Sequence, residues 1–442
     1  MKSFRWTPIF LLFLLFLLAV GCAERADRPR TSAQAISSLD RAAESYVKLV
    51  LAVGQHDPDY VDAFYGPPEW KVQAEAAKRP LADLRAEAAR LAAEIEAMPA
   101  RGDELERLRH QYLTRQLQSM VARLDMLSGT KLSFDEESRA LYDAVAPTHD
   151  AAYFQQVLDR LEAAVPGEGP LPARIDRFRE ELVIPRDRLD AVFQAAIAEC
   201  RRRTLEHVEL PAGESFEVEY VTGKSWGAYN WYRGGFNSLI QVNTDLPIFI
   251  DRAVDLACHE GYPGHHVYNV LIEKHLVVDR GWPEFSVYAL FSPQSLIAEG
   301  TATYGIDVAF PGDERVRFER ETLFPLAGID PATAERYTEI QHLAQELGYA
   351  GNEAARGYLN GTMTREQAVD WLVRYGLIPP ARAEQGTRFY DQYGSYIINY
   401  NRGKDLVREY IERRGGTADN PAKRWEEFEK LLASPRLPSG LG

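Results

Sequence analysis

The stretch that decides this fold is HEGYPGHH, residues 259–266. It places three of the nine histidines of the chain beside a glutamate, inside an apolar run. Neutral imidazole binds zinc well, and H-E-x-x-H metallopeptidases keep their general base in the glutamate after the first histidine. Here the next histidines come at i+6 and i+7 instead of i+4. In an unbroken helix the ring of His265 would point about 120° away from that of His259, and the ring of His266 would lie about 10.5 Å along the helix axis from it. They could not share one ion with it.

Pro263 and Gly264 offer a way around this spacing. Pro263 lacks the N–H that would bond to the carbonyl of His259, and Gly264 accepts backbone angles that other residues avoid. A helix that bulges by about two residues would bring His265 to the place of the i+4 ligand, whereas a bulge of about three residues would bring His266 there. We favour His265 as the second ligand, with His266 as the alternate. The competing interpretation is a helix that starts at Pro263 and presents an exposed histidine pair.

The best candidate for a third ligand is Glu299. It lies in an apolar stretch rich in small residues, 295–305, where a carboxylate would be buried and would need a cation. The alternative is a solvated glutamate on an amphipathic helix. Asp307 and Glu284 are weaker candidates, because their surroundings in the sequence look exposed.

Three more residues are expected to serve this site. Glu260 is the expected general base, which would deprotonate a water as it attacks a substrate carbonyl. Tyr400, in a segment rich in Tyr and Asn, is expected to stabilise the oxyanion, unless that segment is simply a packed helix. Asp255 lies one turn before His259 and is expected either to hold its ring or to be an ordinary surface residue.

The composition excludes some classes of protein. The chain has 442 residues, of which 45% are hydrophobic and 26% charged. That is enough for one large domain or two closely packed ones. The net charge of −14 and the lack of a basic stripe argue against nucleic-acid binding.

The N-terminus has the pattern of a signal peptide. Lys2 and Arg5 precede an apolar run of Leu and Phe, residues 8–20, that is too short for a comfortable membrane span. The residues that follow, AVGC at 19–22, resemble a bacterial lipobox, which predicts lipidation of Cys22. The alternative is ordinary secretion with a chance cysteine.

The remaining cysteines, Cys200 and Cys258, have a spacing that does not demand a bridge. Export would permit a disulfide, but we expect small buried hydrophobic side chains, neither nucleophile nor ligand.

The rest of the chain divides into four regions. These are a signal peptide at 1–22, a flexible tether at 23–36, a helical scaffold at 37–205 and a metal-site catalytic region at 206–442, the last two in one continuous fold. Apolar residues recur at helical spacing through the scaffold.

Two strands are expected directly before the His-Glu helix. Alternation predicts them at 216–220 and 238–243. The small sheet would either offer an edge strand to an extended peptide or form a hairpin that covers the core. After Glu299, helices are expected at 337–349 and 365–375, with Thr364 as the cap of the second.

Taken together, three motifs resemble the bacterial domain-of-unknown-function family 885 over about residues 38–430. They are HExxPGHH at 259–266, EGxAxY at 299–304 and YxxGK at 400–404. The resemblance implies a mostly helical, exported lipoprotein with a metallopeptidase-like site. The sequence departs from the family pattern after the histidine pair, at Val267 and Tyr268, and at Thr301, which bears on substrate preference. The insertion is also similar to the H-E-x-x-G-H of dipeptidyl-peptidase III-like enzymes, in which a bulge absorbs one residue.

These observations predict a mainly α, lipid-anchored zinc hydrolase of the bacterial cell envelope, with a small sheet beside the zinc helix. His259, His265 and Glu299 would hold Zn²⁺ and leave a fourth position for water; Mn, Co or Fe would also suit these ligands. The expected substrate is a peptide or small amide, and the lipid is the expected contact with the membrane. The alternatives are a non-catalytic metal- or ligand-binding lipoprotein and a non-peptide amide or ester hydrolase.

Overall fold

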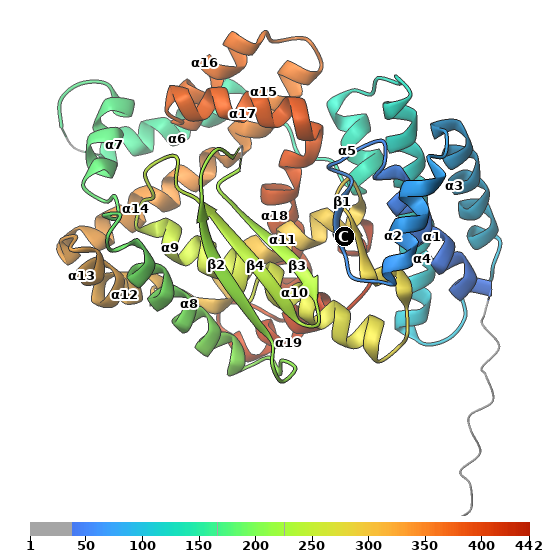
Figure 1. Ribbon diagram of the computed structural model, residues 1–442. Helices are drawn as coiled ribbons and strands as arrows, with labels where there is room; N and C mark the ends of the chain where they lie inside the picture. Colours follow the sequence, from blue (N-terminus) through green and yellow to red (C-terminus); the bar gives the residue numbers. More distant parts are fainter. Residues whose placement is uncertain (1–37, 166, 225) are drawn as a thin grey trace, which may run out of the picture. The chain divides into compact units, whose positions relative to one another are not determined.

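Helices build the first part of the chain, as its periodicity predicts. The computed structural model describes residues 38–165, 167–224 and 226–442. The predicted signal peptide, the lipidation of Cys22 and the tether at 23–36 lie outside these residues. In α1, the expected core positions Ala42, Tyr46 and Val50 are buried. The helices before residue 206 are α1 Ser38–Val53, α2 Pro68–Ala77, α3 Leu81–Glu96, α4 Glu104–Leu127, α5 Phe134–Tyr142, α6 Ala151–Ala164, α7 Leu171–Glu180 and α8 Leu189–Leu205 (Figure 1).

Side-chain caps explain where several helices begin. Asp103 accepts a hydrogen bond from the backbone N–H of Glu106, whose side chain returns a bond to the backbone of Asp103. This reciprocal pair starts α4. The predicted cap Thr364 forms the same arrangement with Gln367, which confirms the expected start of the helix at 365.

A short sheet joins the two predicted halves of the fold. Strand β1, Val61–Phe64, pairs antiparallel with β5, Val287–Ala289, so that Val61 lies opposite Ala289. Neither strand was predicted, because each is short and its partner is more than 200 residues away. Residues 38–442 form one compact unit.

The second sheet lies where the sequence predicts a small sheet, but it has a third strand. Its strands are β2 Ser215–Val221, β3 Ala228–Gly234 and β4 Asn237–Asn243, in the order β2-β4-β3. β2 is parallel to β4, and β3 is antiparallel to β4. The two predicted strands are therefore not a hairpin with each other. The aromatic- and glycine-rich segment between them, which was not predicted as a strand, forms β3 at the edge.

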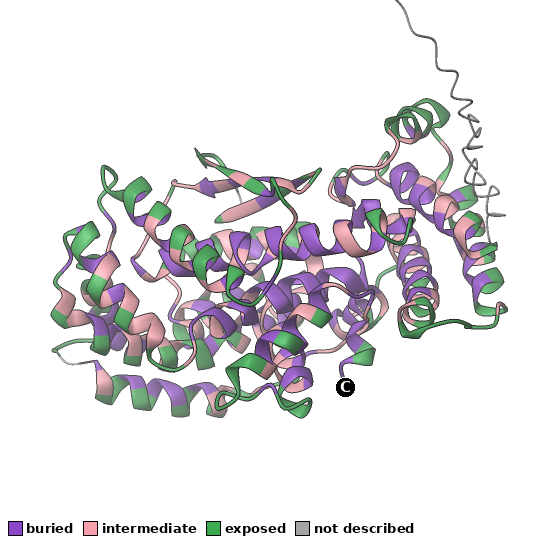
Figure 2. Cartoon of the chain, turned by 90° about the horizontal axis from the view of Figure 1, so that it is seen from below, coloured by how far each residue is buried: buried purple, intermediate pink, exposed green. Residues whose placement is uncertain are grey.

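One face of this sheet covers the helices that carry the His-Glu motif. Every second residue of β4 is buried, namely Ser238, Ile240 and Val242. The sheet lies along one surface of the helical core, with exposed residues on its outer side (Figure 2). The Glu273 carboxylate accepts hydrogen bonds from Gly235 N at 3.0 Å and Phe236 N at 3.2 Å, so it ties the β3–β4 turn to the end of the motif helix.

The remaining chain is again helical, and the prediction of a mainly α fold with small sheets is confirmed. The predicted helix at 337–349 ends as α-helix at Gln345, and a 3₁₀ turn covers Glu346–Tyr349. No helix among the described residues is both long and apolar enough to span a bilayer. The helices are α9 Asp251–Leu256, α10 His265–Ile272, α11 Pro293–Ala309, α12 Glu314–Phe318, α13 Phe324–Ala327, α14 Ala334–Gln345, α15 Ala350–Leu359, α16 Arg365–Gly376, α17 Pro380–Tyr393, α18 Ile398–Arg413 and α19 Pro421–Leu432.

Helices α11 and α18 cross with their backbones in contact. A Cβ atom on Gly300 would lie 2.5 Å from the carbonyl carbon of Gly403, and one on Gly403 would lie 2.9 Å from Leu296 O. Only glycine fits at both positions. This crossing sets the spacing between Glu299 on α11 and two tyrosines, Tyr396 in the turn before α18 and Tyr400 in its first turn.

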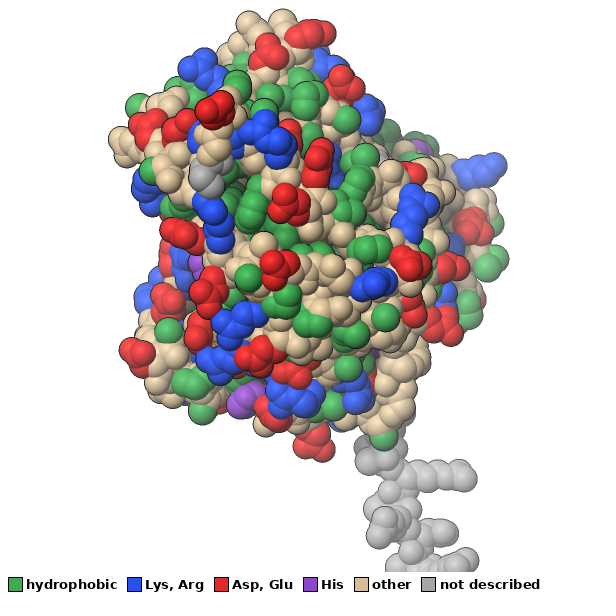
Figure 3. All heavy atoms as spheres, turned by 90° about the vertical axis from the view of Figure 1, so that its left-hand side faces the viewer, with side chains coloured by type: hydrophobic (Ala, Val, Ile, Leu, Met, Phe, Trp, Pro, Cys, Tyr) green, Lys and Arg blue, Asp and Glu red, His purple; other side chains and the backbone are tan. Residues whose placement is uncertain are grey.

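Opposite charges mix on the outer surface of the helices. Arg203 pairs with Glu314, and Arg320 pairs with Glu335 at 2.7 Å. Acidic and basic side chains lie next to each other on the face seen in Figure 3. This face has no extended surface of one sign.

Candidate metal centre

The first histidine of the motif lies on a widened turn of helix. After α9 the chain forms a π-helical turn, Ala257–Gly261, which contains His259 and Glu260. Such turns insert an extra residue into a helix and are frequent at functional sites. Here the turn ends the helix, because Tyr262 adopts an extended backbone.

The Pro-Gly pair interrupts the helix completely. The predicted single bulged helix is therefore wrong in form: one helix ends at Gly261 and α10 begins at His265. The Ala257 carbonyl accepts a hydrogen bond from Tyr262 N at 3.1 Å, and the Cys258 carbonyl accepts one from Gly264 N at 2.9 Å. A Cβ on Gly264 would lie 1.9 Å from the His259 carbonyl oxygen, so the chain turns back too tightly for any other residue.

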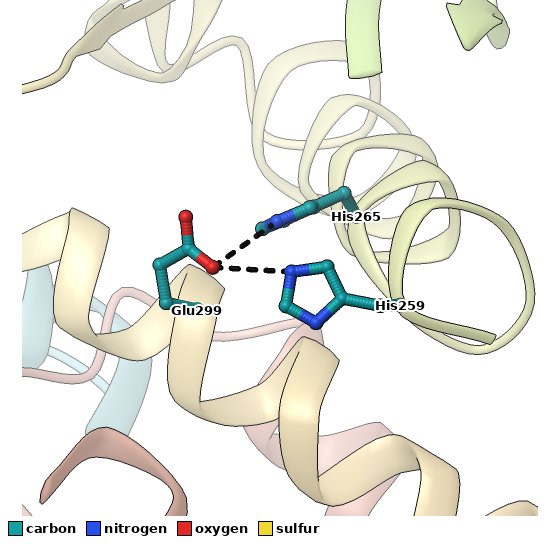
Figure 4. Close-up of side chains that lie close together, drawn as sticks. All are labelled: His259, His265 and Glu299. Carbon is teal, nitrogen blue, oxygen red and sulfur yellow. Dashed lines mark hydrogen bonds and ion pairs between the residues drawn. The ribbon is translucent and has the colours of Figure 1, made fainter. Parts of the chain in front are cut away.

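This interruption aims His265 at the same point as His259. Nε2 of His259 lies 3.1 Å, and Nε2 of His265 3.5 Å, from Oε2 of Glu299 on α11 (Figure 4). One ligand atom from each residue lies within 4.8 Å of the others. The two imidazoles and the carboxylate thus form a group that can hold a metal ion. A set of two His and one Glu is a known catalytic zinc set, so its chemistry fits zinc.

The adjacent histidine faces the opposite way. His266 is fully buried, and its Nε2 is hydrogen-bonded to Glu214 Oε2 at 3.0 Å and its Nδ1 to Ser238 Oγ at 2.9 Å. Glu214 also accepts a hydrogen bond from the Tyr262 hydroxyl at 2.6 Å. His266, the alternate ligand, therefore faces away from the candidate metal centre and holds the loop in place through Glu214 and Ser238. The histidine pair is not exposed.

Charge at the site is balanced between the three candidate ligands. Burial opposes the charging of His265, but the Glu299 carboxylate outweighs it and raises the pKa of His265 to about 9. Burial by itself would raise the pKa of Glu299, yet the two imidazoles hold it well below its usual value. A buried, negatively charged carboxylate between two imidazoles is stabilised by a positive charge, so this position favours the binding of a cation.

The contacts behind the ligands differ from those expected. The Tyr396 hydroxyl donates to Glu299 Oε1 at 2.8 Å and orients the carboxylate. Behind His259, Thr303 Oγ1 lies 3.5 Å from Nδ1. Asp255, the expected partner of that ring, instead pairs with Arg315 at 2.8 Å.

The two weaker ligand candidates have partners elsewhere. Asp307 forms an ion pair with Lys404 at 2.8 Å. Glu284 is completely buried against Arg109, so the expectation of exposed surroundings was wrong for it. Its burial depends on helix α4, which no local pattern around Glu284 reveals.

Glu260 faces the cavity beside the centre without belonging to the ligand group. Glu260 is buried, and its backbone carbonyl accepts a hydrogen bond from Asn230 Nδ2 of β3 at 2.7 Å. The cavity has a volume of about 1080 Å³, and Glu260, the three ligands and Tyr400 line it. The ring centroid of Tyr400 lies 6.4 Å from that of His259.

Two residues at the cavity were missed by sequence reasoning. Asp62 of β1 lines the cavity and accepts a hydrogen bond from the Tyr229 hydroxyl of β3. Burial chiefly raises the pKa of Asp62 to about 6, although Tyr229 opposes the shift. No local signal marks this aspartate, because only the β1–β5 pairing brings it to the cavity.

The expectation for the two internal cysteines was wrong. Cys200 of α8 and Cys258 of the π-helical turn form a disulfide, with Cα atoms 5.8 Å apart. Both residues are buried, as expected, but they are bonded to each other. Their sequence spacing of 58 residues carries no signal, because the packing of α8 against the turn decides the pairing.

Comparisons with known proteins show only a distant likeness. No family model matches the sequence, so the resemblance to family 885 stays a prediction, and no curated protein is similar enough to match. A crystal structure described as that of a candidate lipoprotein from Colwellia psychrerythraea is 14% identical, with a TM-score of 0.49, over 82% of this chain and 68% of that one. A second structure, BsuCP, is 10% identical, with a TM-score of 0.41, over 91% of this chain and 89% of that one.

Proposed function

We propose that this protein is a zinc-dependent hydrolase that cleaves peptides. The observation that carries the proposal is an additional carboxylate, Glu260, that lines the same cavity as the His259–His265–Glu299 group without belonging to it. Zinc held there would polarise a substrate carbonyl and acidify a water molecule. A site that only binds metal has little need for an additional carboxylate that stays outside the ligand group.

The residues of the chain then have separate roles. Glu260 takes the proton from the attacking water and passes it to the leaving amine. Tyr400 donates a hydrogen bond to the carbonyl oxygen as negative charge develops there. Burial raises the pKa of Tyr400 well above its usual value, so its hydroxyl keeps the proton it must donate. Tyr396 fixes the Glu299 carboxylate from behind.

The sheet edge beside the cavity favours a peptide as substrate. β3 pairs with β4 on one side only, and Ala228, Tyr229 and Asn230 of β3 line the cavity. An extended peptide can pair its main chain with such an edge, while pockets hold its alternate side chains.

We also propose that the protein acts in the cell envelope, anchored by lipid on Cys22. The N-terminal sequence supports this, as does the disulfide Cys200–Cys258, since disulfides persist in oxidising compartments outside the cytosol. Metabolic labelling with a radioactive fatty acid tests it: wild-type protein should be labelled, and Cys22→Ser should not.

Glu260→Gln tests the hydrolase itself. The amide cannot take up a proton, so turnover should fall by about 10²–10⁴-fold while zinc content and fold stay unchanged. Elemental analysis gives the zinc content, and mass spectrometry of a digested peptide library identifies a substrate for the rate measurement. Glu339→Gln, an exposed glutamate on α14, is the matched control and should retain full activity.

Three results would contradict the proposal. Wild-type protein without bound zinc rules out the metal. Loss of zinc in Glu260→Gln makes Glu260 a ligand instead of a base. Full turnover in that variant places the base elsewhere.

A further inference from the structure

Three arginines from different helices gather beside the cavity. Arg252 lies on α9, Arg382 on α17 and Arg179 on α7, and the first two line the cavity. After burial, the positive charges of Arg252 and Arg179 are the main influence that lowers the pKa of Arg382. The Arg382 guanidinium therefore lies near enough to the other two to be repelled by each of them. Arg179 reaches the edge of the cavity, because its Nη1 lies 3.4 Å from the carbonyl oxygen of Leu377, next to the lining residue Ile378.

This cluster lacks the acidic partners that neutralise the other basic residues of the cavity. Arg315, Lys404 and Arg408 each pair with a carboxylate at 2.7–2.8 Å. By contrast, among the described residues no carboxylate lies within ion-pairing distance of Arg179 or Arg382. Arg179 donates to the backbone carbonyl of Leu377 at 3.4 Å, and Arg382 donates to that of Pro247 at 3.3 Å.

Arg252 and the nearby carboxylate Asp251 do not remove the excess of positive charge. Arg252 forms an ion pair with Asp255 at 3.2 Å, and Asp255 also pairs with Arg315. The Asp251 carboxylate, which accepts hydrogen bonds from Tyr337 at 2.7 Å and Gln341 at 2.8 Å, adds one negative charge near Arg382. Counting Arg315 and its second partner Glu319, four arginines face three carboxylates, so this region carries surplus positive charge in a protein whose net charge is −14.

Two helical segments connect this cluster with the metal centre. Arg252 precedes His259 by seven residues, which is roughly 10 Å along the helix. On α17, Arg382 begins a face that continues through Phe389 to Tyr393, and all three residues line the cavity. That face spans roughly 16 Å and leads to Tyr396, which contacts Glu299.

We propose that the arginine cluster binds a carboxylate of the substrate. The inference rests on the proposed peptide hydrolysis and names its substrate class. An extended peptide rises about 3.3 Å per residue, so the carboxylate lies about three to five residues from the bond that is cleaved. It is either the free C-terminus of a short peptide or an acidic side chain. Guanidinium groups match carboxylates in shape and charge, which gives both attraction and orientation.

Binding to a catalytically silent protein tests this. The zinc-loaded Glu260→Gln protein is titrated calorimetrically with three acetylated hexapeptides of alanine. One ends in a carboxylate, one ends in a carboxamide, and one ends in a carboxamide but has glutamate as its last residue. We expect at least one of the two carboxylate peptides to bind about tenfold more tightly than the neutral peptide.

The arginine dependence is measured in the same background. Arg382→Gln should abolish the carboxylate preference and leave the affinity for the neutral peptide unchanged. The matched control is Arg388→Gln, on the same helix, exposed and outside the cavity lining, which should keep the preference. Preference for the first peptide assigns the chain end, and preference for the third assigns an acidic side chain.

The proposal is overturned if the three peptides bind equally, if none binds, or if Arg388→Gln removes the preference as Arg382→Gln does. Its failure is distinct from that of the hydrolase. If the protein prefers carboxylate peptides but cleaves none, the carboxylate subsite is supported and the proposed peptidase activity is contradicted. If it cleaves peptides without such a preference, the peptidase activity is supported and the subsite is contradicted.

Discussion

At the scale of single residues, neighbours in the sequence have different partners. His265 begins α10 and points toward Glu299 of α11, whereas His266, about 100° further around the helix, points toward Glu214 and Ser238. Tyr396 and Tyr400, four residues apart, both line the cavity, and Tyr396 in addition donates a hydrogen bond to Glu299. Residue type alone could not assign these roles, because each depends on which element packs against the side chain.

The raised pKa of His265 predicts how metal affinity depends on pH. The Glu299 carboxylate overcomes burial and lifts this pKa to about 9, so His265 carries a proton in the metal-free protein at pH 7. Zinc needs the neutral imidazole and must displace that proton. Apparent zinc affinity should therefore rise roughly tenfold per pH unit between pH 6.5 and 8.5 and level off above about pH 9.

Competition with a chromophoric chelator measures this affinity at each pH. Calorimetry in two buffers of different ionisation enthalpy counts the protons released. An affinity that stays flat between pH 7 and 8.5, with no proton released, would show that His265 is neutral before the metal binds.

At the scale of helices, the crossing of α11 and α18 controls the site. In Gly300→Ala, the new Cβ would lie 2.5 Å from the backbone of Gly403, so the two helices must separate. We expect a loss of about 1–3 kcal/mol in the free energy of unfolding, as is usual for an overpacked core. Zinc affinity should fall as well, because Glu299 lies next to Gly300 on α11, whereas Tyr396, which donates to its carboxylate, lies in the turn Gly394–Ile397 that leads into α18.

Urea unfolding and zinc titration check both effects. The matched control is Gly386→Ala on α17, where the nearest atom to the new Cβ is Leu372 Cδ1 at an ordinary 3.6 Å. Helix propensity favours alanine there, so its stability should stay the same or rise by up to about 1 kcal/mol. If Gly300→Ala behaves like this control, the backbone contact does not constrain the helices.

At the scale of the whole molecule, long-range pairings join the helical scaffold to the metal centre. The β1–β5 sheet links residues 61–64 with 287–289, and the disulfide links α8 with the turn that carries His259. These connections hold residues 38–442 together as one compact unit across residue 206.

Removing the disulfide should lower the free energy of unfolding, with a smaller effect on the positions of the three candidate metal ligands. The bond closes a loop between residues 58 apart, so Cys200→Ala/Cys258→Ala should lose about 2–4 kcal/mol of unfolding free energy. Thermal unfolding of wild-type protein with and without a reducing agent provides the comparison. Reduction should lower the melting temperature of the wild type and leave that of the double variant unchanged. Equal melting temperatures in all four samples would show that the bond contributes nothing.

The sequence by itself determined the helical class, the three candidate metal ligands and the place where their helix breaks. Helical periodicity, the zinc preference of His and Glu, and the effects of Pro263 and Gly264 on the backbone are local properties, readable within a few residues. Only the tertiary structure decided that two helices replace one bulged helix and that Cys200 bonds Cys258. It also brought Asp62, Tyr396, Arg252 and Arg382 to one cavity, with Arg179 close to Arg382. These groups come from elements far apart in the chain, and packing brings such elements together at no fixed sequence spacing.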